Sequence, residues 1–187
     1  MIPFLNSRYG DADITPQKVK GALFSILGEH FYGRIFVDLF SGSGQIGIEA
    51  LSRGVDCVIL NEADRTRYVF IRDFISSINS GDKAVILNMK AVDALSDIAR
   101  RRIKADIFFL DPPYEKVKGE AVSYSSIIES INEAGVLKND GVIVVQHFSS
   151  NILPDKCSVY TRISMKKYGT TSLSVYAVDL NASNQPA

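Results

Sequence analysis

The chain has 187 residues, of which 46% are hydrophobic and 22% charged, a composition typical of a globular protein with a single core. Its 21 basic residues balance 21 acidic ones, which excludes a uniformly basic nucleic-acid-binding protein, so any such contact has to rest on a local patch. No window approaches the ~20 apolar residues of a membrane span, and the N-terminus lacks the apolar segment of a signal peptide.

The two cysteines indicate a reducing compartment. Cys57 and Cys157 form no short-spaced pair, whereas zinc sites and disulfide frameworks use such pairs. Each is expected to be a small apolar core residue. We therefore expect a cytoplasmic protein, a monomer, with no metal and no membrane partner.

The first predicted element is a helix over residues 15–28. Thr15 is expected to cap it, Pro16 suits the first helical position, and Gly28 stands where the helix should end. Its apolar residues recur at helical spacing: Val19, Ala22, Leu23, Ile26 and Leu27.

Strands and helices then alternate along the chain. Apolar runs predict strands over 34–40, 56–62, 83–89, 105–111 and 141–147. Amphipathic segments predict helices over 45–54, 64–79, about 92–103 and about 120–133.

Two final strands, over about 157–165 and 172–178, have no helix between them and should pair as an antiparallel hairpin. The alternation predicts one α/β domain over residues 1–180 with a mainly parallel sheet. The tail, residues 181–187, is expected to be disordered.

A glycine-rich loop follows the first predicted strand. The segment "DLFSGSGQIG" contains G-x-G-x-x-G, formed by Gly42, Gly44 and Gly47, and Glu62 follows 20 positions after Gly42. This pattern usually indicates a dinucleotide cofactor. Asp38, however, precedes the first glycine by four residues, where it would repel a pyrophosphate.

Three carboxylates, those of Asp38, Glu62 and Asp111, fall at or near the carboxyl ends of predicted strands, where open α/β sheets bind ligands. S-adenosylmethionine suits them, because its sulfonium and ammonium groups are cationic and its ribose offers two hydroxyls. We expect Asp38 to face the methionine end and Glu62 to accept the ribose hydroxyls.

The loop between these carboxylates completes the expected cofactor site. Gly42 and Gly44 let the backbone approach the ligand closely, and Ser41 lies in the same turn. Gly47 is expected to serve close helix–sheet packing instead.

The segment Asp111-Pro112-Pro113-Tyr114 predicts the catalytic site. Successive prolines stiffen the backbone and remove two N–H donors, which leaves the Asp111 carboxylate and the Pro112 carbonyl as acceptors. Such a pair can grip the two N–H bonds of an exocyclic base amine, and Asp111 can take its proton. Tyr114 offers a face on which a flipped-out base can stack.

Four segments, "FVDLFSGSGQIGIEALSRG", "LNEADR", "FFLDPPY" and "KKYGTTSLSVYAV", resemble the bacterial 16S rRNA guanine-N2 methyltransferases, the RsmD family. The segment "ITPQKVKGALFSIL" is similar to that family's first helix. The resemblance implies a Rossmann-like class I methyltransferase fold, with a seven-stranded, mainly parallel sheet, a reversed last strand and helices on both faces. It also implies S-adenosylmethionine as donor and 16S rRNA in a small ribosomal subunit particle as substrate.

The sequence departs from the family pattern near its start. The family's Arg-Pro-Thr is replaced by Asp13-Ile14-Thr15, and its Arg-Glu by Lys20-Gly21. The residues before the first helix are few and not basic, whereas the family usually has a basic β-hairpin there.

After the third strand the family often has an acid that could meet the adenine amine. Lys90 holds that place here, with Asp93 three residues on, so no adenine-binding side chain is assigned.

Other readings stay open. N6-adenine methylation of DNA or RNA uses the same amine chemistry, a non-catalytic RNA-binding assembly factor could keep the fold, and a dinucleotide-dependent oxidoreductase would have no use for "DPPY".

His30 and His147 are expected to be structural, although His147 borders the crevice. Local basic patches are candidates for contact with RNA, and for the segment "RRRIK" a cationic helix end is the competing interpretation. The basic residues of all these patches are Arg100, Arg101, Arg102, Lys104, Lys116, Lys118, Lys166 and Lys167.

Overall fold

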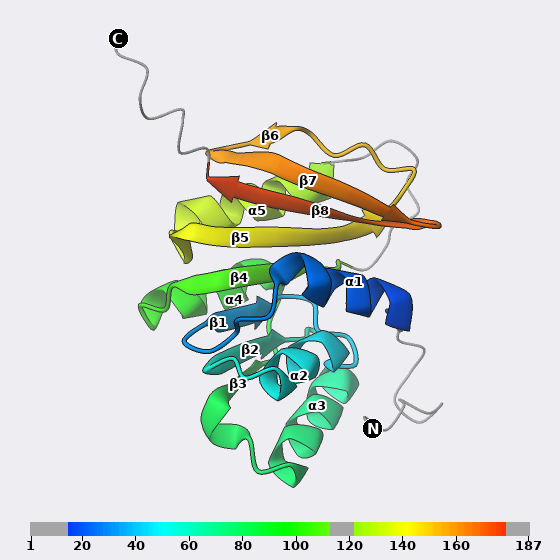
Figure 1. Ribbon diagram of the computed structural model, residues 1–187. Coiled ribbons are helices and arrows are strands. Elements are labelled where there is room, and N and C mark those ends of the chain that lie inside the picture. Colours follow the sequence, from blue (N-terminus) through cyan, green and yellow to red (C-terminus); the bar gives the residue numbers. More distant parts are fainter. Residues whose placement is uncertain (1–14, 113–121, 179–187) are drawn as a thin grey trace.

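The computed structural model describes residues 15–112 and 122–178, which form one β-sheet with helices on both faces (Figure 1). The sheet order is β3-β2-β1-β4-β5-β8-β7-β6. The strands are β1 Ile35–Asp38, β2 Cys57–Asn61, β3 Ala84–Leu87, β4 Ala105–Leu110, β5 Leu137–Phe148, β6 Lys156–Cys157, β7 Tyr160–Tyr168 and β8 Thr171–Val178.

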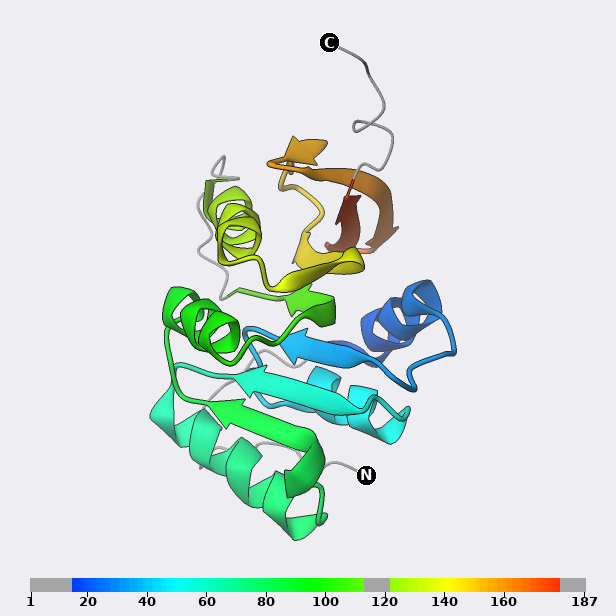
Figure 2. The same cartoon turned by 90° about the vertical axis from the view of Figure 1, so that its left-hand side faces the viewer.

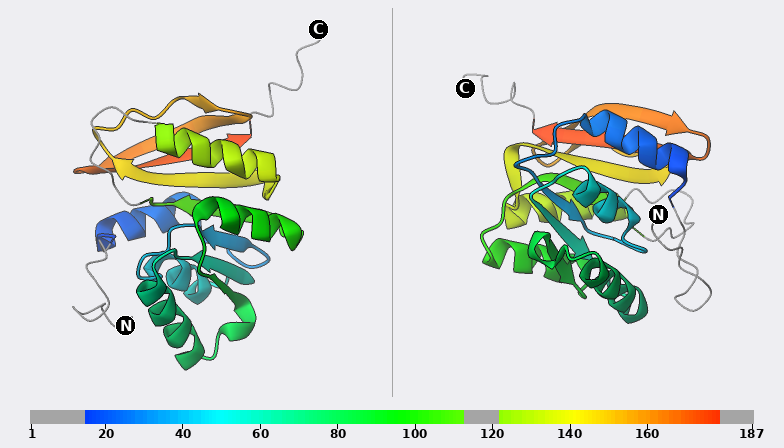
Figure 3. Two further views of the ribbon diagram at one scale, coloured as in Figure 1. Left: turned by 180° about the vertical axis from the view of Figure 1, so that it is seen from behind. Right: turned by 60° about the horizontal axis from the view of Figure 1, so that its bottom comes forward.

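The helices divide between the two faces of the sheet. They are α1 Gln17–Leu27, α2 Gln45–Ser52, α3 Arg65–Ser77, α4 Ala91–Arg100 and α5 Val122–Ala134, with a short 3-10 helix, η1, over Gly81–Lys83. Figures 2 and 3 show α4 and α5 on one face and α1, α2 and α3 on the other. Within the described ranges, no helix is long and apolar enough to cross a bilayer.

Strands β1 to β5 are mutually parallel, and the last strands join them in antiparallel fashion, as predicted. The hairpin of β7 and β8 is confirmed, and its turn lies at the carboxyl end of β5, where Phe148 pairs with Thr171. The hairpin tip therefore lies at the same edge of the sheet as the ends of the parallel strands.

Over the residues that the structure describes, the sheet has eight strands, one more than the seven predicted. The additional strand, β6, consists of two residues that pair with Tyr160 and Thr161 at the start of β7. Two residues are too few to carry a period-2 pattern. Strand β5 also begins earlier than predicted, at Leu137 instead of residue 141. The apolar pattern did not reveal this start, because the first residues of the strand include the polar Lys138, Asn139 and Asp140.

Helix α1 begins at Gln17, two residues after the start of the predicted range. Pro16 is its N-cap residue, and no described side chain caps the helix, so the predicted capping by Thr15 is wrong. Pro16 still starts the helix, because its carbonyl accepts from the amides of Val19 and Lys20. The predicted end at Gly28 is confirmed, with φ of 85° at that glycine.

Two apolar layers sandwich the sheet, because successive strand residues point to opposite faces. In β1, Phe36 packs with α1, α2 and α3, while Val37 packs with α4 and α5, and both are fully buried. Helix α2 approaches the sheet closely at Gly47, where an added Cβ would overlap with Leu60 and lie 3.1 Å from Val58. The packing role predicted for Gly47 is confirmed.

Candidate functional site

A cavity of about 480 Å³ opens at the carboxyl ends of β1, β2 and β4. Strand order reverses between β1 and β4, and ligands of open α/β sheets bind at such switch points. The volume lies within the usual range of small-molecule sites. The walls include most of the predicted site residues: Asp38, Ser41, Gly42, Glu62, Asp111 and Pro112.

Asp38 ends β1 and is only 1% exposed. Neither of its carboxylate oxygens has a hydrogen-bond partner among the described residues. Its pKa is raised to about 8, first because burial removes the carboxylate from water and next because Asp111 places negative charge nearby. The charge of Glu62 raises the pKa further. The backbone amides of Gly47 and Phe40 lower it, although neither makes a hydrogen bond of good geometry with the carboxylate.

Glu62 follows β2 and holds the glycine loop. Its Oε2 accepts from the Gly42 amide at 2.8 Å, and its Oε1 accepts from the Asp64 amide at 2.8 Å. The sequence indicated a ribose-binding role for Glu62 but gave no sign of these hydrogen bonds to the amides of Gly42 and Asp64. The two roles are compatible, because two carboxylate oxygens offer about four acceptor sites.

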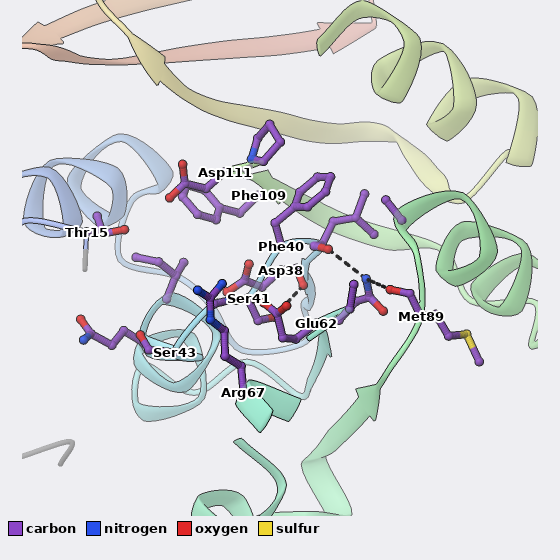
Figure 4. Close-up of a pocket in the computed structure, with 18 of the residues that line it drawn as sticks. Thr15, Asp38, Phe40, Ser41, Ser43, Glu62, Arg67, Met89, Phe109 and Asp111 are labelled. Atoms are coloured by element: carbon purple, nitrogen blue, oxygen red, sulfur yellow. Dashed lines mark hydrogen bonds between the residues drawn. The ribbon is translucent and has the colours of Figure 1, made fainter. Parts of the chain in front are cut away.

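Neighbouring asparagines tie the strand ends together. The Asn61 side chain donates to the carbonyls of Leu39 and Met89, each at 3.1 Å, which links the ends of three strands (Figure 4). Asn88 donates to the carbonyl of Glu62 at 2.8 Å. These amides hold the Glu62 backbone in place, and no sequence signal identified them.

The glycines of the loop differ in their surroundings. Nothing among the described residues lies within 4 Å of a Cβ added at Gly42, so the backbone there faces open cavity. At Gly44, which has φ of 77° and precedes α2, a Cβ would meet Ile71 at 3.1 Å and Ile48 at 3.3 Å. Gly44 therefore contributes a left-handed turn and close packing, and its predicted contact with the cofactor stays a prediction.

Asp111 comes directly after β4 and is held by a residue that sequence reasoning missed. The Gln146 side chain, on β5, donates from Nε2 to Asp111 Oδ2 at 2.8 Å. Pro112 is buried and lines the cavity. Pro113 and Tyr114 lie outside the described residues, as do Lys116 and Lys118, so their predicted roles stay predictions.

Cationic side chains also reach the cavity. Arg67 enters from α3 (Figure 4), and Lys90, the N-cap residue of α4, lines the wall. Asp93, three residues after Lys90 in the first turn of α4, is exposed. Thr15 lines the cavity from the start of α1. An arginine in the first turn of a surface helix gives no signal in sequence that it faces a ligand site.

Several other predicted features are structural. His147 is fully buried, its Nε2 lies 2.9 Å from the Ser174 hydroxyl, and burial lowers its pKa, which supports the structural interpretation. At the end of α4, Arg100 and Arg101 both pair with Asp97, as expected of a cationic helix terminus.

Comparisons with known proteins agree with this architecture. A family model described as "Conserved hypothetical protein 95" matches residues 14–177. The Bacillus subtilis protein YlbH, named provisionally as an rRNA methyltransferase, is 32% identical over 162 residues, covering 87% of this chain and 85% of the relative. The Haemophilus influenzae "Ribosomal RNA small subunit methyltransferase D" is 28% identical over 178 residues, covering 94% and 86%. A solved structure of a conserved hypothetical protein from Streptococcus pyogenes matches with a TM-score of 0.75 at 29% identity, covering 86% of this chain and 95% of that one.

Proposed function

The chain belongs to the family described as Conserved hypothetical protein 95, that of the RsmD-type rRNA methyltransferases, and from this premise we propose its reaction. It transfers a methyl group from S-adenosylmethionine to the exocyclic N2 amine of a guanine in 16S rRNA, within a small ribosomal subunit particle. Relatives named as rRNA methyltransferases support the enzyme class and the substrate class. The observation that carries the chemistry is the meeting of Asp38, Glu62 and Asp111 on one cavity.

The residues of the cavity fit this cofactor. When bound, S-adenosylmethionine supplies a methyl group on a positively charged sulfur. Asp38, whose buried carboxylate has no hydrogen-bond partner among the described residues, is suited to the cationic methionine end. Glu62 is suited to the ribose hydroxyls, and the open space at Gly42 admits a ligand close to the backbone. A pyrophosphate would meet the same three carboxylates unfavourably.

Asp111 and Pro112 are the acceptors for the target amine. The amine is a weak nucleophile, and two acceptors on its N–H bonds direct its lone pair toward the methyl carbon. As the nitrogen–carbon bond forms and the carbon–sulfur bond breaks, the nitrogen loses one proton, which Asp111 is placed to accept. Tyr114, from its place in the sequence, would stack on the flipped base.

A labelling experiment tests the proposal. Tritiated S-adenosylmethionine is incubated with the protein and with unmethylated 30S particles, free 16S rRNA or DNA, and the labelled nucleoside is identified by chromatography. We expect N2-methylguanosine from the particles. Label in N6-methyladenine would replace the guanine assignment, and a protein that binds the cofactor yet labels none of these substrates would indicate an assembly factor.

A further inference from the structure

The carboxylate of Asp111 has a built-in partner on the neighbouring strand. Strands β4 and β5 pair in parallel with Leu110 opposite Val145, so the next residue of each strand, Asp111 and Gln146, lie side by side. Gln146 is 4% exposed, and its Nε2 lies 2.8 Å from Asp111 Oδ2. The Gln146 side of the contact is therefore shielded from water, while Asp111 is half-buried at the edge of the cavity.

A neutral amide suits this position better than a charged donor. The cavity wall already carries the carboxyl groups of Asp38 and Glu62, and a negative charge at Asp111 beside them needs a donor to stabilise it. A lysine or arginine would bind the carboxylate strongly and compete with the incoming amine. An amide N–H restrains rotation of the carboxylate while using one of about four acceptor sites.

We propose that Gln146 is a positioning residue for methyl transfer, which fixes the orientation of the Asp111 carboxylate toward the target amine. This inference rests on the proposed function. Gln146 acts through Asp111, so its effect belongs to turnover and not to cofactor binding. A purely structural amide would change stability and leave turnover intact.

The charged and titratable groups around Asp111 come from several elements. The same cavity is lined by Asp38 at the end of β1, Glu62 after β2, Arg67 of α3 and Lys90 at the start of α4. Tyr124 of α5 is also near, since its pKa is raised chiefly by burial and also by the charge of Asp111. The variants below change only the group on β5, so these neighbours are common to all of them.

Two substitutions separate positioning from structure. Gln146→Leu keeps the approximate volume without a donor, and we expect kcat to fall about 10- to 100-fold, with little change in the affinity for S-adenosylmethionine. Gln146→Glu can donate only while the pair shares a proton, so its turnover relative to wild type should fall as pH rises and the two carboxylates repel. Ser174→Ala is the control, because it removes a buried hydrogen bond to His147 on the adjacent strand.

Wild-type turnover in Gln146→Leu, or an equal loss in Ser174→Ala at equal stability, would overturn the proposal. A readout independent of activity uses carbon-13 NMR of labelled aspartate, with the Asp111 signal assigned by its loss in Asp111→Asn. Gln146→Leu should move the pH midpoint of that signal upward, and an unmoved midpoint would also overturn the proposal. If the wild type methylates no substrate, the proposed function fails, while the midpoint still reports whether Gln146 holds Asp111.

Discussion

The carboxylate of Glu62 links the glycine loop to the start of α3, so its loss should disturb the loop as well as remove acceptors for the ribose. Hydrogen bonds to a charged group contribute about 1.5–3 kcal/mol each. We expect Glu62→Ala to weaken S-adenosylmethionine binding about 10- to 100-fold by calorimetry. Glu49→Ala is the control, because Glu49 pairs with Lys20 of α1 and with Arg53, apart from the residues that line the cavity. Unchanged affinity in Glu62→Ala would remove Glu62 from the site.

Asp111 should affect chemistry more than binding. In the proposed reaction its contact with the amine strengthens as charge develops on the nitrogen, and losing one such group typically lowers kcat by about 10²–10³. We therefore expect this loss in Asp111→Ala, with cofactor affinity little changed. Asp106→Ala is the control, since Asp106 lies at the other end of β4 and pairs with Lys138 at 2.8 Å. Near-normal turnover of Asp111→Ala on 30S particles would show that the motif is only a turn.

At the level of elements, α2 can approach β2 only because residue 47 has no side chain. An alanine there would press on Leu60 and Val58, both fully buried and unable to yield easily. We expect Gly47→Ala to lower the free energy of unfolding by about 1–3 kcal/mol. Gly21→Ala is the opposite case, because Gly21 lies in α1 with no described atom within 4 Å of an added Cβ. It should stabilise the protein by about 0.5–1 kcal/mol in denaturant titrations, and equal effects of the two substitutions would contradict this packing.

The end of α4 should contribute stability to the helix and little to RNA binding. Arg100 and Arg101 both pair with Asp97, which is buried. Replacing Arg100, Arg101 and Arg102 by glutamine should leave the salt dependence of RNA affinity unchanged. Loss of phosphate contacts would instead flatten the slope by about 0.7–0.9 per contact, and a binding assay across a salt series distinguishes the two.

Two lysines near the tip of the β7–β8 hairpin provide the comparison variant for that assay. Lys166 and Lys167 are exposed on β7, near the turn that lies at the carboxyl end of β5. These lysines therefore stand at the edge of the sheet where the cavity opens. In the same salt series, their replacement by glutamine is expected to flatten the slope, which would place the RNA on this side of the molecule.

For the whole molecule, the buried Asp38 couples folding to pH. Its folded pKa is about 8 against an ordinary value of 3.8, so between these values the folded state holds more protons than the unfolded state. Stability therefore falls as pH rises through this window and the carboxyl ionises. Asp38→Asn cannot ionise, so its Tm should gain on that of the wild type as pH rises from about 4 to about 8, and the difference should level off above that pH. A Tm difference that does not change with pH would show that Asp38 stays ionised throughout.

The sequence by itself determined the alternation of elements and the carboxyl groups that stand at their ends. The run "RIFVDLF" is apolar because both faces of β1 are covered, so period and composition were enough to predict that strand. Gly28 and Gly47 were readable because a positive φ or a close approach admits little else. Asp38, Glu62 and Asp111 could be assigned to one crevice because parallel strands end at one edge of a sheet.

Only the tertiary structure decided which residues serve these carboxylates. Gln146 reaches Asp111 across 35 positions because β5 lies beside β4, and Arg67 faces the cavity because of how α3 is placed. The raised pKa of Asp38 likewise sums burial and the charges of Asp111 and Glu62 at two other strand ends. Local patterns of hydrophobicity encode the strands but neither the neighbours of each side chain nor the dielectric around it, and these arise when the sheet assembles.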